Sequence, residues 1–296
     1  MQEQFDRSAG VLMPVSSLPG PYGIGTFGKK AYEFVDNLVK ARQKYWQVLP
    51  LGPTSFGDSP YASFSAFAGN PYFIDLDMLI EEGLLTKEFV DSKRWNIEDQ
   101  YVDYGLVYNS RFEVLRVAYE NSNHKELDEY KEFFTEDYSL YRACKDKYEG
   151  RPWSEWDKKI KFREGETVGA FKEELKDDMD FYKFIQFKFN EQWCKLKEYA
   201  NENGILIIGD IPIYVAMDSA DVWQNTGMFQ LDEELNPKKV AGVPPDAFSD
   251  LGQRWGNPLY DWDKMEADDF SWWRKRMEHS AKIYDVIRID HFIGTV

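Results

Sequence analysis

The chain has 296 residues, of which 43% are hydrophobic and 30% are charged, a balance typical of a folded globular protein with one large or two small domains. Its formal net charge of −16 argues against nucleic acid or a membrane surface as a partner, because both reward a basic footprint. With two cysteines, no apolar run near about 18 residues and no signal-peptide core at the N-terminus, we expect a cytoplasmic protein without a disulfide framework or a metal-ligand cluster.

The first segment of the chain predicts a βαβ unit. Residues 11–15 are typical of a strand, residues 27–44 have the period of a helix, and residues 45–51 form a second apolar strand. A helix between two strands implies that the strands are parallel. Loops rich in glycine and proline follow both strands, at 16–25 and 52–70. The loop at 52–70 is either a packed surface loop or a ligand-contacting loop at the carboxyl edge of a parallel sheet, where ligands bind.

The chain then changes character, and three segments are expected. Residues 1–78 hold the first βα units and their loops, residues 79–203 are a mainly helical insertion rich in charge, and residues 204–296 return to the sheet. The insertion ends in a helix with an apolar stripe that we interpret as core.

The last segment holds two further strands, a long loop and a helix. Residues 205–210 are an apolar run that is typical of a strand buried on both faces, and Asp210 ends it. Residues 218–262 have many turn residues and little period, which predicts an ordered lid without regular structure. A helix at 270–284 leads into the final strand at 284–290.

Arg288 and Asp290 are candidate catalytic residues on that final strand. Because side chains alternate along a strand, the two point to the same side. A neighbouring cation lowers the pKa of a carboxylate, as a carboxylate nucleophile requires. The alternative is a structural ion pair at a strand end. Asp210 is then either the second carboxyl group of a glycoside-cleaving pair or a group that binds sugar hydroxyls. The 17% of aromatic residues fit a large core and, more weakly, stacking on sugar rings.

Several loops carry longer motifs. They are residues 17–25 (SLPGPYGIG), 57–61 (GDSPY), 67–71 (FAGNP), 209–216 (GDIPIYVA), 218–223 (DSADVW), 240–246 (VAGVPPD), 255–260 (WGNPLY) and 288–292 (RIDHF). In this order they resemble the 4-α-glucanotransferases of glycoside hydrolase family 77. Residues 79–203 carry no such motif.

The resemblance implies an α/β fold of the (β/α)8 TIM-barrel type, of which this chain would hold the N-terminal half, with the helical insertion and long active-site loops. It implies the transfer of α-1,4-glucan segments between maltooligosaccharides derived from starch or glycogen, by a retaining double displacement. It implies neither a metal nor an organic cofactor.

The resemblance also assigns roles to residues. Asp290 is the expected nucleophile and Arg288 the arginine that keeps it ionised. For Asp210 the resemblance favours sugar binding over the role of an acid. The expected substrate-binding residues are Ser59, Tyr61, Asp210, Asp246, Phe248, Gln253, Trp255 and His291.

The chain departs from the family at a few positions and in length. Ile293 stands where many members have an arginine, Thr295 and Val296 where many have an aromatic, and Phe56 where some have a tyrosine. Four strands are predicted where a TIM barrel has eight. We therefore expect the N-terminal portion of a longer enzyme, with the acid/base residue beyond Val296 and no activity in this portion alone. The alternatives are an α-glucan hydrolase of the same barrel type and a non-catalytic glucan-binding fragment.

Overall fold

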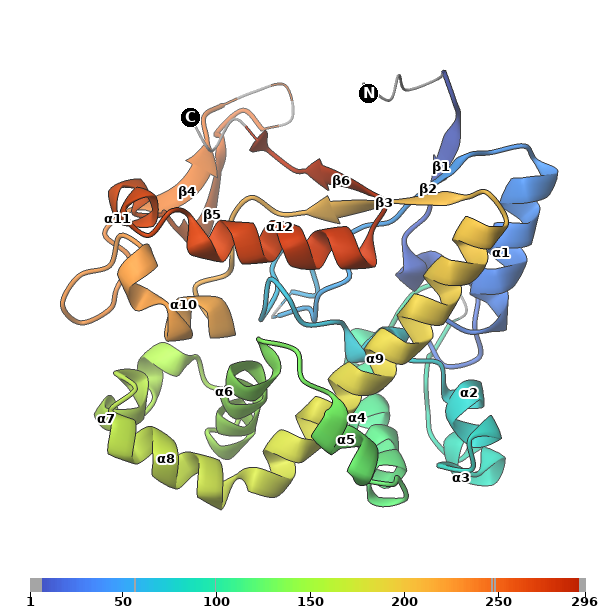
Figure 1. The fold of residues 1–296 in the computed structure, drawn as a ribbon, viewed down its shortest axis with the longest axis horizontal. Helices are drawn as coiled ribbons and strands as arrows, with labels where there is room; N and C mark the ends of the chain where they lie inside the picture. Colours follow the sequence, from blue (N-terminus) through green and yellow to red (C-terminus); the bar gives the residue numbers. More distant parts are fainter. Residues whose placement is uncertain (1–6, 56, 99, 246, 248, 293–296) are drawn as a thin grey trace.

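A parallel sheet lies at the centre of the molecule (Figure 1). A computed structural model describes residues 7–55, 57–98, 100–245, 247 and 249–292. The strands run in the order β1-β2-β3-β6, and all neighbours are parallel. They are β1 (Gly10–Leu12), β2 (Tyr45–Gln47), β3 (Leu206–Ile211) and β6 (Val286–Ile289). The predicted α/β class with a parallel sheet is confirmed, and in the described part of the chain the sheet is open, with β1 and β6 at its edges.

The strands differ from their predicted bounds for local reasons. The first strand stops at Leu12, because Pro14 has no backbone N–H to donate and Val15 begins a 3-10 turn. The second strand stops at Gln47, although the amide of Val48 still donates to the carbonyl of Ile208 at 3.0 Å. The central strand β3 matches its prediction within one residue at each end, since its apolar run is continuous.

Helices form most of the remaining structure. The α-helices are α1 (Lys29–Lys40), α2 (Leu76–Glu81), α3 (Lys87–Asp91), α4 (Tyr104–Glu120), α5 (Lys125–Glu129), α6 (Thr135–Lys147), α7 (Lys158–Lys161), α8 (Gly165–Glu174), α9 (Lys176–Glu202), α10 (Ala220–Gln224), α11 (Trp262–Ala267) and α12 (Ser271–Ile283). Short 3-10 helices are η1 (Val15–Ser17), η2 (Pro71–Phe73), η3 (Trp153–Glu155) and η4 (Thr226–Met228). The long helix α9 packs against α1 and β3, and α12 packs against α9 and β6. The last helix of the predicted insertion therefore belongs to the layer that covers the sheet.

Aromatic side chains fill two buried clusters. In the first, around the sheet and α9, the ring of Phe27 lies 5.1 Å from that of Trp193. In the second, between α6 and α10, Trp153 and Trp223 are fully buried. Large apolar rings dominate the energy of such cores. Many of the aromatic residues that make the sequence unusual are therefore core residues.

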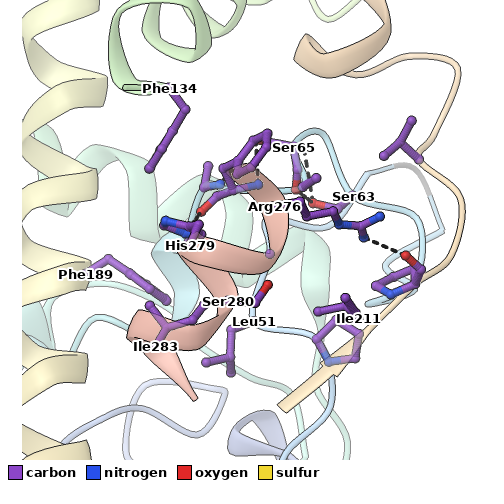
Figure 2. Close-up of a pocket in the computed structure, with 18 of the residues that line it drawn as sticks. Leu51, Ser63, Ser65, Phe134, Phe189, Ile211, Arg276, His279, Ser280 and Ile283 are labelled. Carbon is purple, nitrogen blue, oxygen red and sulfur yellow. Dashed lines mark hydrogen bonds between the residues drawn. The ribbon is translucent and has the colours of Figure 1, made fainter. Parts of the chain in front are cut away.

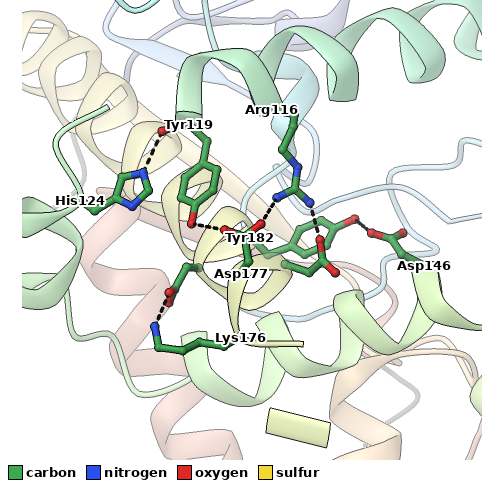
Figure 3. A network of polar contacts seen from close by, with 9 residues as sticks. Arg116, Tyr119, His124, Asp146, Lys176, Asp177 and Tyr182 are labelled. Carbon is green, nitrogen blue, oxygen red and sulfur yellow. Dashed lines mark hydrogen bonds and ion pairs between the residues drawn. The ribbon is translucent and has the colours of Figure 1, made fainter. Parts of the chain in front are cut away.

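Polar contacts tie the helices of the central block together (Figure 3). Arg116 of α4 donates to Asp177 in the first turn of α9 at 3.0 Å, and Tyr119 donates to the same carboxylate at 3.1 Å. A carboxylate in the first turn is also favoured by the helix dipole. Further along α9, the hydroxyl of Tyr182 donates to Asp146 of α6 at 2.6 Å. Helix α9 therefore joins α4 and α6 as well as the sheet.

The prediction that residues 218–262 lack regular structure is wrong. In the described part of this stretch lie α10, η4 and an antiparallel hairpin of β4 (Val240–Val243) and β5 (Gln253–Pro258), and α11 begins at its last residue, Trp262. The register shifts between Val240 and Gly242, which marks a bulge. Short strands with a bulge and two glycines show no period of two, and this explains why the sequence pattern missed them.

The two cysteines are free thiols, Cys144 buried and Cys194 exposed. Among the helices that the structure describes, none combines the length and the apolarity that crossing a bilayer requires.

Candidate functional site

Asp210 and Arg288 meet at the carboxyl end of the sheet because β3 and β6 are adjacent parallel strands. The register places Asp210 opposite Arg288 and Ile211 opposite Ile289. Asp290 follows directly, and its amide donates to the carbonyl of Ile211 at 3.0 Å. The charged side chains predicted at strand ends therefore lie together, at the sheet edge where ligands bind in parallel α/β folds.

The guanidinium of Arg288 joins the two carboxylates. Its Nη1 donates to both oxygens of Asp210 at 2.6 Å, and its Nη2 donates to Oδ1 of Asp290 at 2.6 Å. The side chain of Asp210 is 1% exposed, whereas that of Asp290 is 34% exposed. Hydrogen bonds to Asp210 raise the pKa of Arg288 further above neutrality, so it remains a cation. Asp290 is therefore the carboxylate that faces solvent, and Asp210 is the buried one.

Tyr61 reaches the same cluster from the loop after β2. Its hydroxyl donates to Oδ2 of Asp210 at 2.8 Å. Burial, together with this hydrogen bond to Asp210, raises the pKa of Tyr61 to about 12, so the phenol stays protonated and remains a donor. A turn at Ser59 sets the position of the ring, because the Tyr61 amide donates to the Ser59 hydroxyl at 3.3 Å.

Helix α9 fixes the far part of that loop. The side-chain amide of Gln186 accepts from the N–H of Gly69 at 2.7 Å and donates to its carbonyl at 3.0 Å. Both polar atoms of a buried amide are thereby satisfied, which makes this contact specific for one loop position. A Cβ at Gly69 would meet the ring of Phe189 at 2.2–2.3 Å, so the loop can approach the helix this closely only with glycine.

The hairpin supplies an aromatic wall on the other side. The indole of Trp255 donates to the side chain of Gln253 at 3.0 Å, and the edge of the Trp255 ring meets the ring of His291 at 4.8 Å between centroids. His291 has φ +52°, a backbone conformation that residues with a Cβ rarely adopt. Such conformations cluster at functional sites, and this one directly follows Asp290.

These elements enclose a cleft of about 620 Å³. It is large enough for sugar units, and it combines polar groups with aromatic faces as ligand sites do. The predicted site residues that line it are Ser59, Tyr61, Gln253, Trp255, Asp290 and His291. Asp210 and Arg288 lie at its base through their contacts with Tyr61 and Asp290. The structure therefore brings together every predicted site residue that it describes.

Two predicted site residues, Asp246 and Phe248, lie outside the described residues. The same holds for the positions that depart from the family pattern, Phe56, Ile293, Thr295 and Val296.

One side of the cleft was not predicted as a site. Residues 212–217 run from the end of β3 along the cleft, and Tyr214, Ala216 and Met217 line it. The ring of Tyr214 stacks on that of Tyr260 at 6.0 Å and 21°. The segment is mostly apolar and has no charged side chain. Apart from the motif at 209–216, nothing in its residues indicated a binding role.

A second, narrower cavity lies between the loop after β2, α9 and α12 (Figure 2). Its volume of about 60 Å³ suits about two water molecules and is too small for a sugar. Buried His279 borders it and donates through Nε2 to the carbonyl of Phe67 at 2.9 Å, while burial lowers its pKa. The cavity also borders Tyr61 and Asp210, so it adjoins the cleft from behind the loop, and of the two only the cleft has room for a sugar.

No group of three or more His, Cys, Asp and Glu side chains within the described ranges is arranged to hold a metal ion. The chemistry of the cleft is that of carboxylates, a guanidinium and aromatic rings.

Comparisons with known proteins point to one family. The family model described as 4-alpha-glucanotransferase, glycoside hydrolase family 77, matches residues 13–296. A protein of Clostridium butyricum named 4-alpha-glucanotransferase is 54% identical over 289 residues, which cover 95% of this chain and 59% of that protein. A Thermus thermophilus protein of the same name is 45% identical, with 98% and 59% coverage. The chain thus spans about three fifths of the length of these relatives.

Solved structures give the same result. An amylomaltase from Streptococcus agalactiae in complex with acarbose superposes with a TM-score of 0.95 at 44% identity, covering 98% of this chain and 60% of that one. An amylomaltase from Corynebacterium glutamicum superposes with a TM-score of 0.74 at 18% identity, covering 97% of this chain and 41% of that one, which shows a shared fold.

Proposed function

Because the chain belongs to the 4-alpha-glucanotransferase family, glycoside hydrolase family 77, we propose that its cleft transfers α-1,4-glucan segments between maltooligosaccharides. The observation that carries the proposal is the bridge from Arg288 to Asp210 and Asp290 at the floor of an aromatic cleft. The complex of the Streptococcus agalactiae relative with acarbose supports an oligosaccharide as ligand. Maltooligosaccharides from starch or glycogen are the proposed substrates.

Asp290 is the proposed nucleophile. A carboxylate attacks the anomeric carbon with an oxygen that solvent and substrate can reach, and Asp290 is 34% exposed while Arg288 holds its Oδ1 at 2.6 Å. The backbone hydrogen bond from Asp290 to Ile211 holds the residue at the strand end. Attack would give a glycosyl-enzyme, which an acceptor sugar then resolves with net retention.

Asp210 is proposed to bind sugar hydroxyls and to orient Arg288, and not to act as the acid. Both of its oxygens accept from Arg288, and Oδ2 also accepts from Tyr61. These three hydrogen bonds occupy both oxygens, and the side chain is 1% exposed, so neither oxygen is placed to pass a proton to a leaving group.

The general acid is proposed to lie outside the residues that the structure describes. Among the described residues that line the cleft, Asp290 supplies the only carboxylate. One carboxylate cannot be both the nucleophile and the acid that protonates the leaving oxygen. The described residues of the cleft by themselves therefore provide a nucleophile but no acid, and we expect them to bind glucan without turning it over.

The hairpin is proposed to act as the cover that selects sugar over water as acceptor. Gln253 and Trp255 line the cleft from β5, close to His291 and Asp290. A cover that excludes water protects a glycosyl-enzyme from hydrolysis. The competing function is an α-glucan hydrolase, in which water would resolve the same intermediate.

Product analysis separates the two functions. With maltotriose, the protein expressed from its complete gene should give glucose and a ladder of longer maltooligosaccharides. Glucose and maltose alone would show a hydrolase.

Asp290→Asn tests the nucleophile in the same protein. It should lower the transfer rate by on the order of a thousandfold, since an amide cannot attack, while the melting temperature changes little. Asp269→Asn is the control, because Asp269 also pairs with an arginine, Arg274, on the exposed surface. A variant at position 290 that keeps its rate within a few-fold of wild type would remove Asp290 from this role.

A further inference from the structure

The cleft wall at residues 212–218, named here the wall segment, has no regular secondary structure, yet side chains from other elements hold its backbone. Arg276 of α12 donates to the carbonyl of Pro212 at 2.5 Å, as α12 faces the end of β3. Tyr260 donates to the carbonyl of Ile213 at 2.8 Å, and Asn257 of β5 donates to that of Val215 at 2.8 Å. Buried carbonyls require such partners, and here they come from side chains instead of a neighbouring strand.

The far end of the wall segment is held by α6 and η3, which belong to the helical block, the name used here for residues 79–203. Asp218 accepts from Lys145 at 2.6 Å and from Tyr141 at 2.8 Å, both on one face of α6. It also accepts from the backbone N–H of Trp153 at 3.1 Å, while the indole of Trp153 donates to the carbonyl of Met217 at 2.7 Å. Five residues of two distant parts of the chain thus form one polar junction.

The lysine of the junction is buried, and its hydrogen-bonding capacity is fully used. The Lys145 side chain is 7% exposed and its ammonium also donates to the carbonyls of Gly150 and Arg151 at 2.7 and 3.0 Å. All three ammonium protons therefore have acceptors. Removing the lysine would leave Asp218, whose side chain is 29% exposed, without its charged partner and with only the donors of Tyr141 and Trp153.

The wall segment places side chains in the cleft directly before this junction. Tyr214, Ala216 and Met217 line the cleft, and Met217 is the residue whose carbonyl Trp153 holds. A wall that is fixed before the ligand arrives does not lose the conformational entropy of ordering on binding. The positions of Tyr214, Ala216 and Met217 in the cleft, and how firmly they are held, thus depend on the side chains that α6 and η3 contribute to the junction.

The geometry points to Lys145, Trp153 and Asp218 as positioning residues for glucan binding. Through them the helical block, which carries no motif of the family, sets the shape of the cleft wall that contacts sugar. The inference rests on the proposed function and adds to it a role for residues that do not touch substrate.

The chain offers a matched control. Lys188 of α9 pairs with Glu82 at 2.7 Å, and the side chains are 7% and 29% exposed, the same values as for Lys145 and Asp218. Lys188 also pairs with Glu191, so it matches Lys145 in burial and has one carboxylate partner more. Neither Lys188 nor its two glutamate partners line the cleft. A loss that follows only from burying an unpaired charge will appear in both variants.

The experiment compares Lys145→Met with Lys188→Met in the 296-residue chain. Hydrogen exchange of the backbone amides of residues 212–218, read by mass spectrometry, reports the order of the wall segment. Binding of maltoheptaose, read by the fluorescence of tryptophan, reports the cleft. For Lys145→Met we expect exchange at least about fivefold faster in this segment and binding about five- to tenfold weaker, as for the loss of one fixed contact. For Lys188→Met we expect neither change.

A second pair of variants tests the same junction in case Lys145→Met does not fold. Trp153→Phe removes the indole donor to Met217 and keeps an aromatic ring. Trp223→Phe is its control, because Trp223 is also fully buried and donates to a carbonyl, that of Ile160, away from the cleft. Faster exchange in residues 212–218 with Trp153→Phe, and not with Trp223→Phe, supports the inference.

The outcomes separate this inference from the proposed function. If the exchange of the wall segment changes equally in test and control variants, the positioning role is overturned. If it changes selectively but binding of maltoheptaose does not, the junction is structural and the role in glucan binding is overturned. If the wild-type chain does not bind maltoheptaose at all, the proposed function fails, whereas selective exchange would still show that the junction orders the wall.

In the protein expressed from its complete gene, Lys145→Met should raise KM for maltotriose about five- to tenfold with kcat nearly unchanged. A fall in kcat without a change in KM would contradict a binding role.

Discussion

Replacing Arg288 by lysine tests the bridge between the two aspartates. Lysine keeps the positive charge but offers one ammonium group in place of a planar fork of donors. The arginine uses Nη1 for Asp210 and Nη2 for Asp290, each at 2.6 Å. One nitrogen cannot occupy both positions, so at least one carboxylate loses its partner.

The size of the effect follows from these contacts. A hydrogen bond to a charged group contributes about 1.5–3 kcal/mol, so the loss of the bond to Asp290 predicts a fall in kcat/KM of about 10- to 150-fold. Stability should change by about 1 kcal/mol or less, because Arg288 is 45% exposed and lysine can still pair with Asp210.

The assay is the disproportionation of maltotriose by the protein from its complete gene, with thermal denaturation of the same samples. Arg274→Lys is the control, since Arg274 and Asp269 form an ion pair whose side chains are 63% and 81% exposed. A folded lysine variant at position 288 whose kcat/KM stays within about twofold of wild type would refute the reasoning, because the fork would then be dispensable. An equal loss in the control would point to a general effect of the substitution.

Two further predictions concern stability. Burial raises the pKa of Asp221 from 3.8 to about 6, so its contribution to stability is complete below about pH 4 and is lost as the pH rises through about 6. Asp221→Asn keeps an acceptor for the amide of Ala66. It should therefore raise the melting temperature at about pH 7.5 and hardly change it at about pH 4. An equal shift at both pH values would contradict a raised pKa of Asp221. Gly209→Ala should destabilise by about 1–3 kcal/mol in urea denaturation, because the new Cβ would lie 2.1–2.5 Å from the ring of Tyr284. Gly169→Ala in α8 meets open space and should stabilise by about 0.5–1 kcal/mol, so a change of the same sign in both glycine variants would be inconsistent with the packing.

Secondary structure followed from local pattern where the pattern was strong. The apolar run before Asp210 and the stripe along α9 each depend on neighbours in sequence. The strand appears within one residue of its predicted bounds, and the stripe lies on a helix as predicted. The contact of Arg288 with Asp290 followed in the same way from the alternation of side chains along a strand. The hairpin β4–β5 was missed because its bulge and glycines hide its period.

The site as a whole could not be derived from the residues alone. Alternation places Arg288 beside Asp290, but it does not show that two of the three hydrogen bonds of Arg288 go to Asp210, 78 residues away. Nor does it show that Tyr61 donates to the same carboxylate across 149 residues. Motif resemblance marked the residues as important, and the register of β3 against β6 decided how they touch.

By itself, the sequence determined the class of the fold, the places of the four strands of the main sheet, the helical character of the central block and the family. These properties follow from composition, from the spacing of apolar residues and from short motifs, because each depends on residues within a few positions of one another. The tertiary structure alone decided that Arg288 bridges two carboxylates and that Lys145 holds Asp218 across 73 residues. Such contacts depend on which strands and helices become neighbours when the core is buried, and they leave no trace in the local sequence.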